Sequence, residues 1–87
     1  MNKTFSKDAW EDITYWCDKD PKMFNKILKI LKDIERNGYK GIGKQERLSG
    51  SLSSYWSRRI DHKNRIVYKI ENNAVVIIQC GSHYRDK

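Results

Sequence analysis

Residues 65–82 read RIVYKIENNAVVIIQCGS, and this stretch decides the fold. It holds two runs rich in β-branched residues, 65–70 and 74–82, on either side of the polar Glu71-Asn72-Asn73. β-branched residues favour strands, and Asn favours tight turns. So short a connection implies antiparallel pairing, because parallel strands need a longer crossover. The stretch therefore predicts a β-hairpin.

Immediately before it, residues 55–60 predict another strand, which ends at the polar turn 61–64. Side chains alternate between the two faces of a strand. On this basis Arg65, Val67 and Lys69 share a face. His83, just after the strand 74–82, continues the face of Val75, Ile77, Gln79 and Gly81. In residues 55–60, Tyr55, Ser57 and Arg59 are predicted on one face, with Trp56, Arg58 and Ile60 on the other.

The N-terminal half has helical spacing instead. Residues 1–5 can form a short strand, and Ser6 is a suitable N-cap for a first helix. Asp20-Pro21 begins a second helix, which Asn37-Gly38 ends. Apolar residues recur at helical spacing in both, at Ala9, Trp10, Ile13, Trp16 and Cys17 in the first and at Phe24, Ile27, Leu28, Leu31 and Ile34 in the second.

These elements predict an α+β fold for a single domain, residues 1–87. Two antiparallel N-terminal helices pack on one face of an antiparallel β-sheet, and the other face is left for function. The segment from Gly38 to Gly43 is predicted to be a flexible connector. It does not match a phosphate-binding loop, because the full motif G-x-x-x-x-G-K-[ST] is not present and no strand precedes the segment.

Composition narrows the classes of protein. The net charge is +7, which favours polyanionic partners. The chain contains no run of 18 apolar residues and no apolar N-terminal signal, so we expect no membrane association. Cys17 and Cys80 fit no metal-ligand spacing, and both are predicted to be reduced core thiols, which indicates a cytoplasmic protein.

Three side chains could together cleave RNA. Such cleavage needs a base for the 2′-hydroxyl, a cation for the crowded phosphate and an acid for the 5′-oxygen. Glu46, Arg65 and His83 supply one of each, and the neighbouring Lys44 and Arg47 favour the ionised form of Glu46. No cofactor and no metal is expected. Taken singly, each of the three is an ordinary surface residue in most proteins.

The pattern resembles a known family, the YoeB toxins of the RelE/ParE toxin–antitoxin superfamily. The residues that carry the resemblance are Trp10, Trp16, Gly41-Ile42-Gly43-Lys44, Glu46, Ser57-Arg58-Arg59-Ile60, His62, Arg65-Ile66-Val67-Tyr68 and His83-Tyr84. It implies a microbial-ribonuclease-like, RelE-like fold. It also implies a metal-independent endoribonuclease that cuts mRNA in the ribosomal A site and inhibits translation. Such chains usually end at the His-Tyr pair, whereas this one continues with Arg85-Asp86-Lys87.

The same resemblance implies roles and partners. Glu46 would be the general base, His83 the general acid and Arg65 the cation at the phosphate, assisted by Arg59. Tyr84, with Trp56 or Tyr55, would position the RNA. The implied partners are a YefM-type antitoxin, the 70S ribosome with its mRNA, and a second copy in a homodimer. Operator DNA would be bound only through the antitoxin.

Two alternatives remain open from the sequence. One is a non-catalytic ParE-like toxin that inhibits DNA gyrase on a similar scaffold. The other is a basic RNA- or ribosome-binding module, for which the positive charge and the alternation of aromatic and Arg residues in 55–59 would suffice. Codon preference and oligomeric state are not encoded in any pattern found here.

Overall fold

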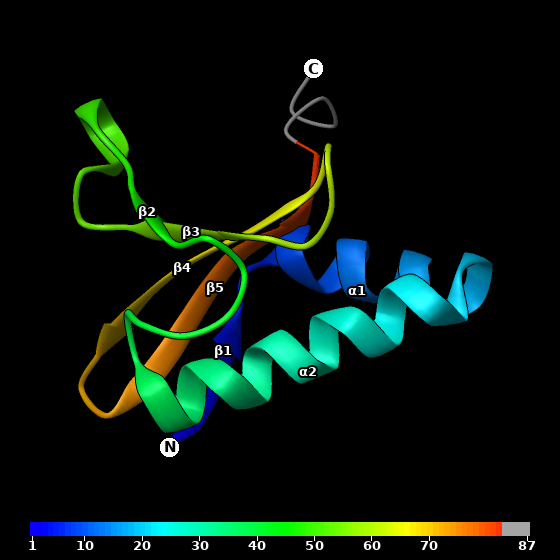
Figure 1. The fold of residues 1–87 in the computed structure, drawn as a ribbon, viewed down its shortest axis with the longest axis horizontal. Helices are drawn as coiled ribbons and strands as arrows, with labels where there is room; N and C mark the ends of the chain where they lie inside the picture. The colour runs from blue at the N-terminus through cyan, green and yellow to red at the C-terminus, as the bar shows by residue number, and fades with distance from the viewer. Residues whose placement is uncertain (83–87) are drawn as a thin grey trace.

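The computed structural model describes residues 1–82, and Figure 1 shows the arrangement of its elements. Two helices lie on the same side of a five-stranded sheet. In chain order the elements are β1 (Asn2–Phe5), α1 (Lys7–Lys19), α2 (Pro21–Asn37), β2 (Glu46–Arg47), the 3-10 turn η1 (Gly50–Leu52), β3 (Trp56–Arg59), β4 (Arg65–Glu71) and β5 (Ala74–Gly81).

The helices begin where the sequence predicts. The Ser6 hydroxyl accepts a hydrogen bond from the Ala9 amide at 3.1 Å, which caps α1. The Asp20 carboxylate accepts from the Met23 amide at 3.2 Å, and Pro21 opens α2. These local signals fix the helix starts and the tight bend between the two helices.

The sheet order is β1-β5-β4-β3-β2. The pairs β2–β3, β3–β4 and β4–β5 are antiparallel, and the pair β1–β5 is parallel. The α+β architecture of two helices on a sheet is therefore confirmed, and the sheet is mixed because the N-terminal strand joins its edge in parallel. In the sequence, α1, α2 and the strands β2 to β4 lie between β1 and β5.

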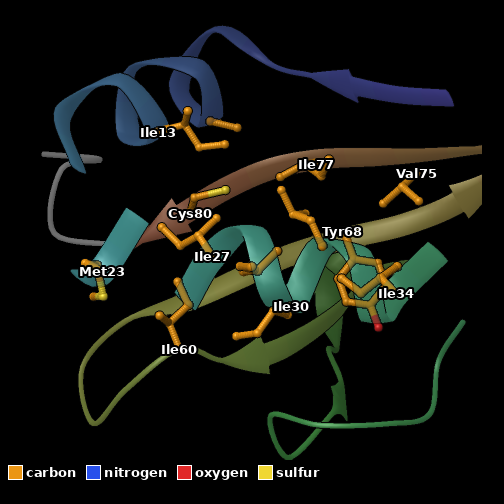
Figure 2. Close-up of a cluster of buried hydrophobic side chains, with 13 residues drawn as sticks. Ile13, Met23, Ile27, Ile30, Ile34, Ile60, Tyr68, Val75, Ile77 and Cys80 are labelled. Carbon is orange, nitrogen blue, oxygen red and sulfur yellow. The ribbon is translucent and has the colours of Figure 1, made fainter. Parts of the chain in front are cut away.

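The core lies between the helices and the sheet (Figure 2). The α1 stripe is narrower than predicted, because Ala9 and Ile13 are buried whereas Trp10 is 56% exposed. Cys80 is buried as predicted, but the prediction for Cys17 is wrong, since that thiol is exposed. Trp10 and Cys17 each follow a residue that faces the core by one position, which turns their side chains about 100° around the helix.

A β-bulge changes which residues of β5 face the core. Tyr68 pairs with Ile77, but the preceding Val67 pairs with Gln79, so Ile78 is an extra residue. Cys80 consequently joins Ile77 in the core (Figure 2). The prediction that Gln79 and Gly81 continue the face of Ile77 is therefore wrong, because strict alternation holds only without a bulge.

Within residues 1–82, neither helix is long and apolar enough to cross a lipid bilayer.

Candidate active site

Three adjacent strands bring Glu46, Ser57 and Arg65 together. Glu46 in β2 pairs with Ser57 in β3, and Ser57 pairs with Val67 in β4, two residues from Arg65. Arg65 Nη1 lies 3.3 Å from Glu46 Oε1 and donates to Ser57 Oγ at 2.8 Å. The predicted base and the predicted phosphate-binding cation are thus in direct contact.

The contact between Glu46 and Arg65 is open to solvent. The Glu46 side chain is 63% exposed and the Arg65 side chain 33% exposed. Ion pairs this exposed stabilise proteins little, so an incoming phosphate can compete for the guanidinium. Ser57 is fully buried, and its hydroxyl gives Arg65 a second hydrogen-bond partner besides Glu46.

A cleft of about 310 Å³ opens over these side chains. Its lining is polar and mostly cationic, and consists of Lys44, Gln45, Glu46, Arg59 and Arg65. Arg59 enters because its Cα pairs with that of Arg65 across β3 and β4. The structure therefore brings Glu46, Arg59 and Arg65 together at one cleft.

The C-terminal end of β5 approaches the same cleft. Gly81 pairs with Arg65, at the start of β4. Beyond the end of β1, side chains of α1 form hydrogen bonds with the backbone at the edge of β5. Asp12 accepts from the Cys80 amide, and Trp16 Nε1 donates to the Cys80 carbonyl, each at 2.8 Å. His83 and Tyr84, the predicted acid and the predicted RNA-positioning ring, lie outside the described residues, as do Arg85-Asp86-Lys87.

The sequence reasoning missed the importance of Arg58. Its side chain is completely buried, and it forms an ion pair with Asp33 of α2. Its guanidinium also donates to the carbonyls of Gly38, Lys40 and Ile42. The alternation that put Arg58 on the core face was the available signal, because a buried charge requires a partner.

These bonds order the segment from Gly38 to Gly43, which leads to Glu46. The Ile42 amide also donates to the Asp33 carboxylate at 3.1 Å. The prediction of a flexible connector is therefore wrong, because one buried guanidinium holds three of the loop's carbonyls. The hydrogen bond from Arg58, followed by that from the Ile42 amide, lowers the pKa of Asp33, so this carboxylate stays ionised.

The two aromatic candidates at the start of β3, Tyr55 just before the strand and Trp56 as its first residue, have different surroundings. The ring of Tyr55 lies under the Lys69 ammonium, 5.0 Å from the nitrogen. Trp56 is partly buried against the core and stacks on Tyr39 with 4.9 Å between ring centroids. Trp56 therefore lies on the strand face opposite Arg59, whereas Tyr55 is on the open face.

Residues 1–82 contain no group of three or more His, Cys, Asp or Glu side chains that could hold a metal ion. The chemistry available in the described part of the cleft is that of a carboxylate, two guanidiniums and an ammonium.

Comparisons with known proteins agree with this architecture. The family of YoeB-like toxins of bacterial type II toxin–antitoxin systems matches residues 5–84. Toxin YoeB of Streptomyces coelicolor is 45% identical over 84 residues, which cover 97% of this chain and 100% of that protein.

Solved structures give the same result. The heterotetrameric YoeB-YefM toxin–antitoxin complex of Staphylococcus aureus contains a chain with a TM-score of 0.91 and 47% identity, covering 97% of this chain and 98% of that one. The YoeB dimer of Staphylococcus aureus matches with a TM-score of 0.89, 47% identity and the same coverage. A family match over residues 5–84 and identities well above 30% assign the fold and the family together: this chain belongs to the YoeB-like toxins of bacterial type II toxin–antitoxin systems.

Proposed function

We propose that this toxin is a metal-independent, ribosome-dependent endoribonuclease that cuts mRNA in the ribosomal A site and so inhibits translation. The observation that carries the proposal is the contact of Glu46 with Arg65 in an open, cationic cleft. A carboxylate 3.3 Å from a guanidinium places a proton acceptor beside a phosphate-binding group. Transesterification of RNA needs these two groups side by side.

In the proposed reaction the 2′-oxygen attacks the adjacent phosphorus, and Glu46 accepts the 2′-hydroxyl proton. The bond from phosphorus to the 5′-oxygen breaks, and His83 gives that oxygen a proton. The products are a 2′,3′-cyclic phosphate and a 5′-hydroxyl. Arg65, fixed by Ser57, stabilises the extra negative charge on the phosphoryl oxygens in the transition state.

The remaining site residues bind the RNA. Arg59 lines the cleft beside Arg65 and neutralises phosphate charge. Tyr84 positions the substrate next to His83. Tyr55 is half-buried and lies just before β3, on the open face, where a base can stack. Trp56 contributes indirectly, because its stacking on Tyr39 supports β3.

The proposal includes partners. A YefM-type antitoxin with an acidic tail would inhibit the toxin, since the related toxin of Staphylococcus aureus is found in a YoeB-YefM complex. The related YoeB dimer supports a homodimer here. A net charge of +7 suits both the acidic tail and ribosomal RNA. The toxin would contact operator DNA only through the antitoxin, and all of these partners are cytoplasmic.

Cleavage on programmed ribosomes tests the proposal. Purified toxin is added to ribosomes stalled with a defined A-site codon, and mRNA ends are mapped by primer extension. Wild type should cut within that codon. Intact mRNA together with inhibited supercoiling by gyrase would establish the ParE-like alternative, and ribosome binding without any cleavage would establish the non-catalytic RNA-binding module.

Variants of the three catalytic candidates make the test specific. Glu46→Ala and His83→Ala should slow cleavage about 10²–10⁴-fold, and Arg65→Ala about 10²–10³-fold. All should retain the wild-type circular dichroism spectrum and ribosome binding. Glu71→Ala, Arg36→Ala and His62→Ala are matched controls outside the cleft. Wild-type cleavage by His83→Ala would refute its assignment as the acid.

The pH dependence provides a second check. With a carboxylate base and an imidazole acid, single-turnover cleavage should be bell-shaped in pH. A rate that is constant between about pH 5 and 9 would contradict proton transfer by Glu46 and His83.

A further inference from the structure

A second groove adjoins the candidate cleft on the side of α2. It has a volume of about 270 Å³ and is lined by Lys26 and Lys29 of α2, by Ile30, by Ile42-Gly43 of the ordered loop, and by Arg59-Ile60. Its lining contains no carboxylate among the described residues. The groove thus combines an apolar floor with a cationic rim.

Arg59 joins this groove to the cleft. Its side chain lines both cavities, the cleft with Lys44, Glu46 and Arg65 and the groove with the two lysines. The backbone fixes the boundary, because the Arg59 amide donates to the Gly43 carbonyl. The two cavities therefore lie on either side of one strand end, and a chain that leaves the cleft past Arg59 enters the groove.

The cations of the groove are available to a ligand. Arg59 and Lys29 form no ion pair with any of the described residues 1–82. Lys26 is near Asp61, whose carboxylate accepts hydrogen bonds from Asn64 and from the Lys63 amide. All three cations are exposed, whereas the Ile30 and Ile60 residues that line the groove with them are buried.

We infer that this groove, with Lys26 and Lys29, binds the phosphate backbone of the RNA strand next to the phosphate held in the cleft. The inference rests on the proposed function and extends it with a second RNA-binding subsite. RNA is favoured over an acidic protein segment because the groove adjoins the cleft in which the proposed function places an RNA phosphate, so the neighbouring phosphates of that strand lie beside it.

The salt dependence of RNA binding tests the inference without requiring cleavage. The probe is a fluorescent single-stranded RNA with 2′-O-methyl groups throughout, which cannot be cleaved because its 2′-oxygens are blocked. Affinity is measured by anisotropy from low to moderate salt. The double variant Lys26→Gln, Lys29→Gln should reduce the slope of log K against log salt by about 1.4, because each contact with a single strand contributes about 0.7.

The matched control is Lys7→Gln, Lys32→Gln. It removes the same charge from exposed helical positions outside the groove, and Lys32 lines a different cavity, which it shares with Lys3 and Phe5. The control should keep the wild-type slope. Equal losses in the two double variants would show that only net charge matters and would overturn the inference.

Three other results would also overturn it. The first is that the wild-type protein does not bind the probe at low salt. The second is that the double variant binds the probe like wild type but binds vacant ribosomes more weakly, and the third is that it binds the probe like wild type but binds a polyglutamate peptide more weakly. The second result would assign the groove to ribosomal RNA, and the third to an acidic protein. If ribosomal cleavage fails while the slope still falls, the proposed function is wrong and the RNA-binding groove stands.

Discussion

Substitution of Asp33 by Asn tests whether a buried ion pair holds the loop that leads to Glu46. The change keeps the shape of the side chain but removes the charge opposite Arg58, whose guanidinium is completely buried. Removal of one partner of a buried pair typically costs about 3–5 kcal/mol. Because 17% of the Asp33 side chain remains exposed, water can partly replace it. We therefore expect a loss of about 2–3 kcal/mol in the free energy of unfolding.

For a domain of this size, that loss lowers the melting temperature by roughly 10–20 °C. Urea denaturation followed by tryptophan fluorescence measures the free energy directly. The matched control is Glu35→Gln, which removes a carboxylate two residues away on the same helix. Glu35 pairs with Lys3 at 2.9 Å, and both side chains are 31% exposed, so its loss should leave the urea midpoint nearly unchanged.

A second comparison isolates the charge. Replacement of Arg58 by Met removes the buried cation, so in that background Asp33→Asn should cost much less than it does in wild type. Equal effects of Asp33→Asn and Glu35→Gln, or equal effects of Asp33→Asn in both backgrounds, would refute the reasoning that the guanidinium needs this carboxylate.

Three further predictions concern the same structure. Gly41→Ala should destabilise the protein strongly in thermal melts, because Gly41 has φ +115° and a Cβ there would meet Asp33 Oδ2 at 2.0 Å, whereas Gly50→Ala, with open space at its Cβ, should cost less. The lowered pKa of Asp33 means that its stabilisation is complete above the unfolded pKa of about 3.9 and is lost as pH falls through the folded pKa. Acid denaturation curves of Asp33→Asn should accordingly be flatter than wild type below about pH 4, and parallel curves would contradict this. Burial raises the pKa of the Cys80 thiol, so a thiol reagent at pH 8 should modify the exposed Cys17 alone until urea unfolds the chain; early modification of Cys80 would count against its burial.

Much of the fold follows from local signals. The caps at Ser6 and Asp20, the stop at Gly38 and the turn at Asn72-Asn73 each depend on neighbours a few residues away, and the structure has all of them. Pairing of adjacent strands follows from the short turns between them. These features are readable because the interactions that produce them are close in sequence.

Other features depend on contacts between distant residues. The β-bulge at Ile78 moves Cys80 into the core and cannot be seen in an alternating apolar run. Cys17 and Trp10 are exposed because the sheet covers a narrower stripe of α1 than the apolar residues occupy. The parallel pairing of β1 with β5 joins residues more than 70 positions apart.

The amino-acid pattern is enough to predict an α+β chain whose base, cation and acid candidates have the spacing of a toxin family. The contact of Glu46 with Arg65, and the hydrogen bond from Arg65 to Ser57, follow from the packing of three strands. Tertiary packing also makes Arg58, one residue from the candidate cleft, a structural cation. The reason is physical: a charge becomes a binding group or a buried support according to which side of a strand faces the core, and packing fixes that side.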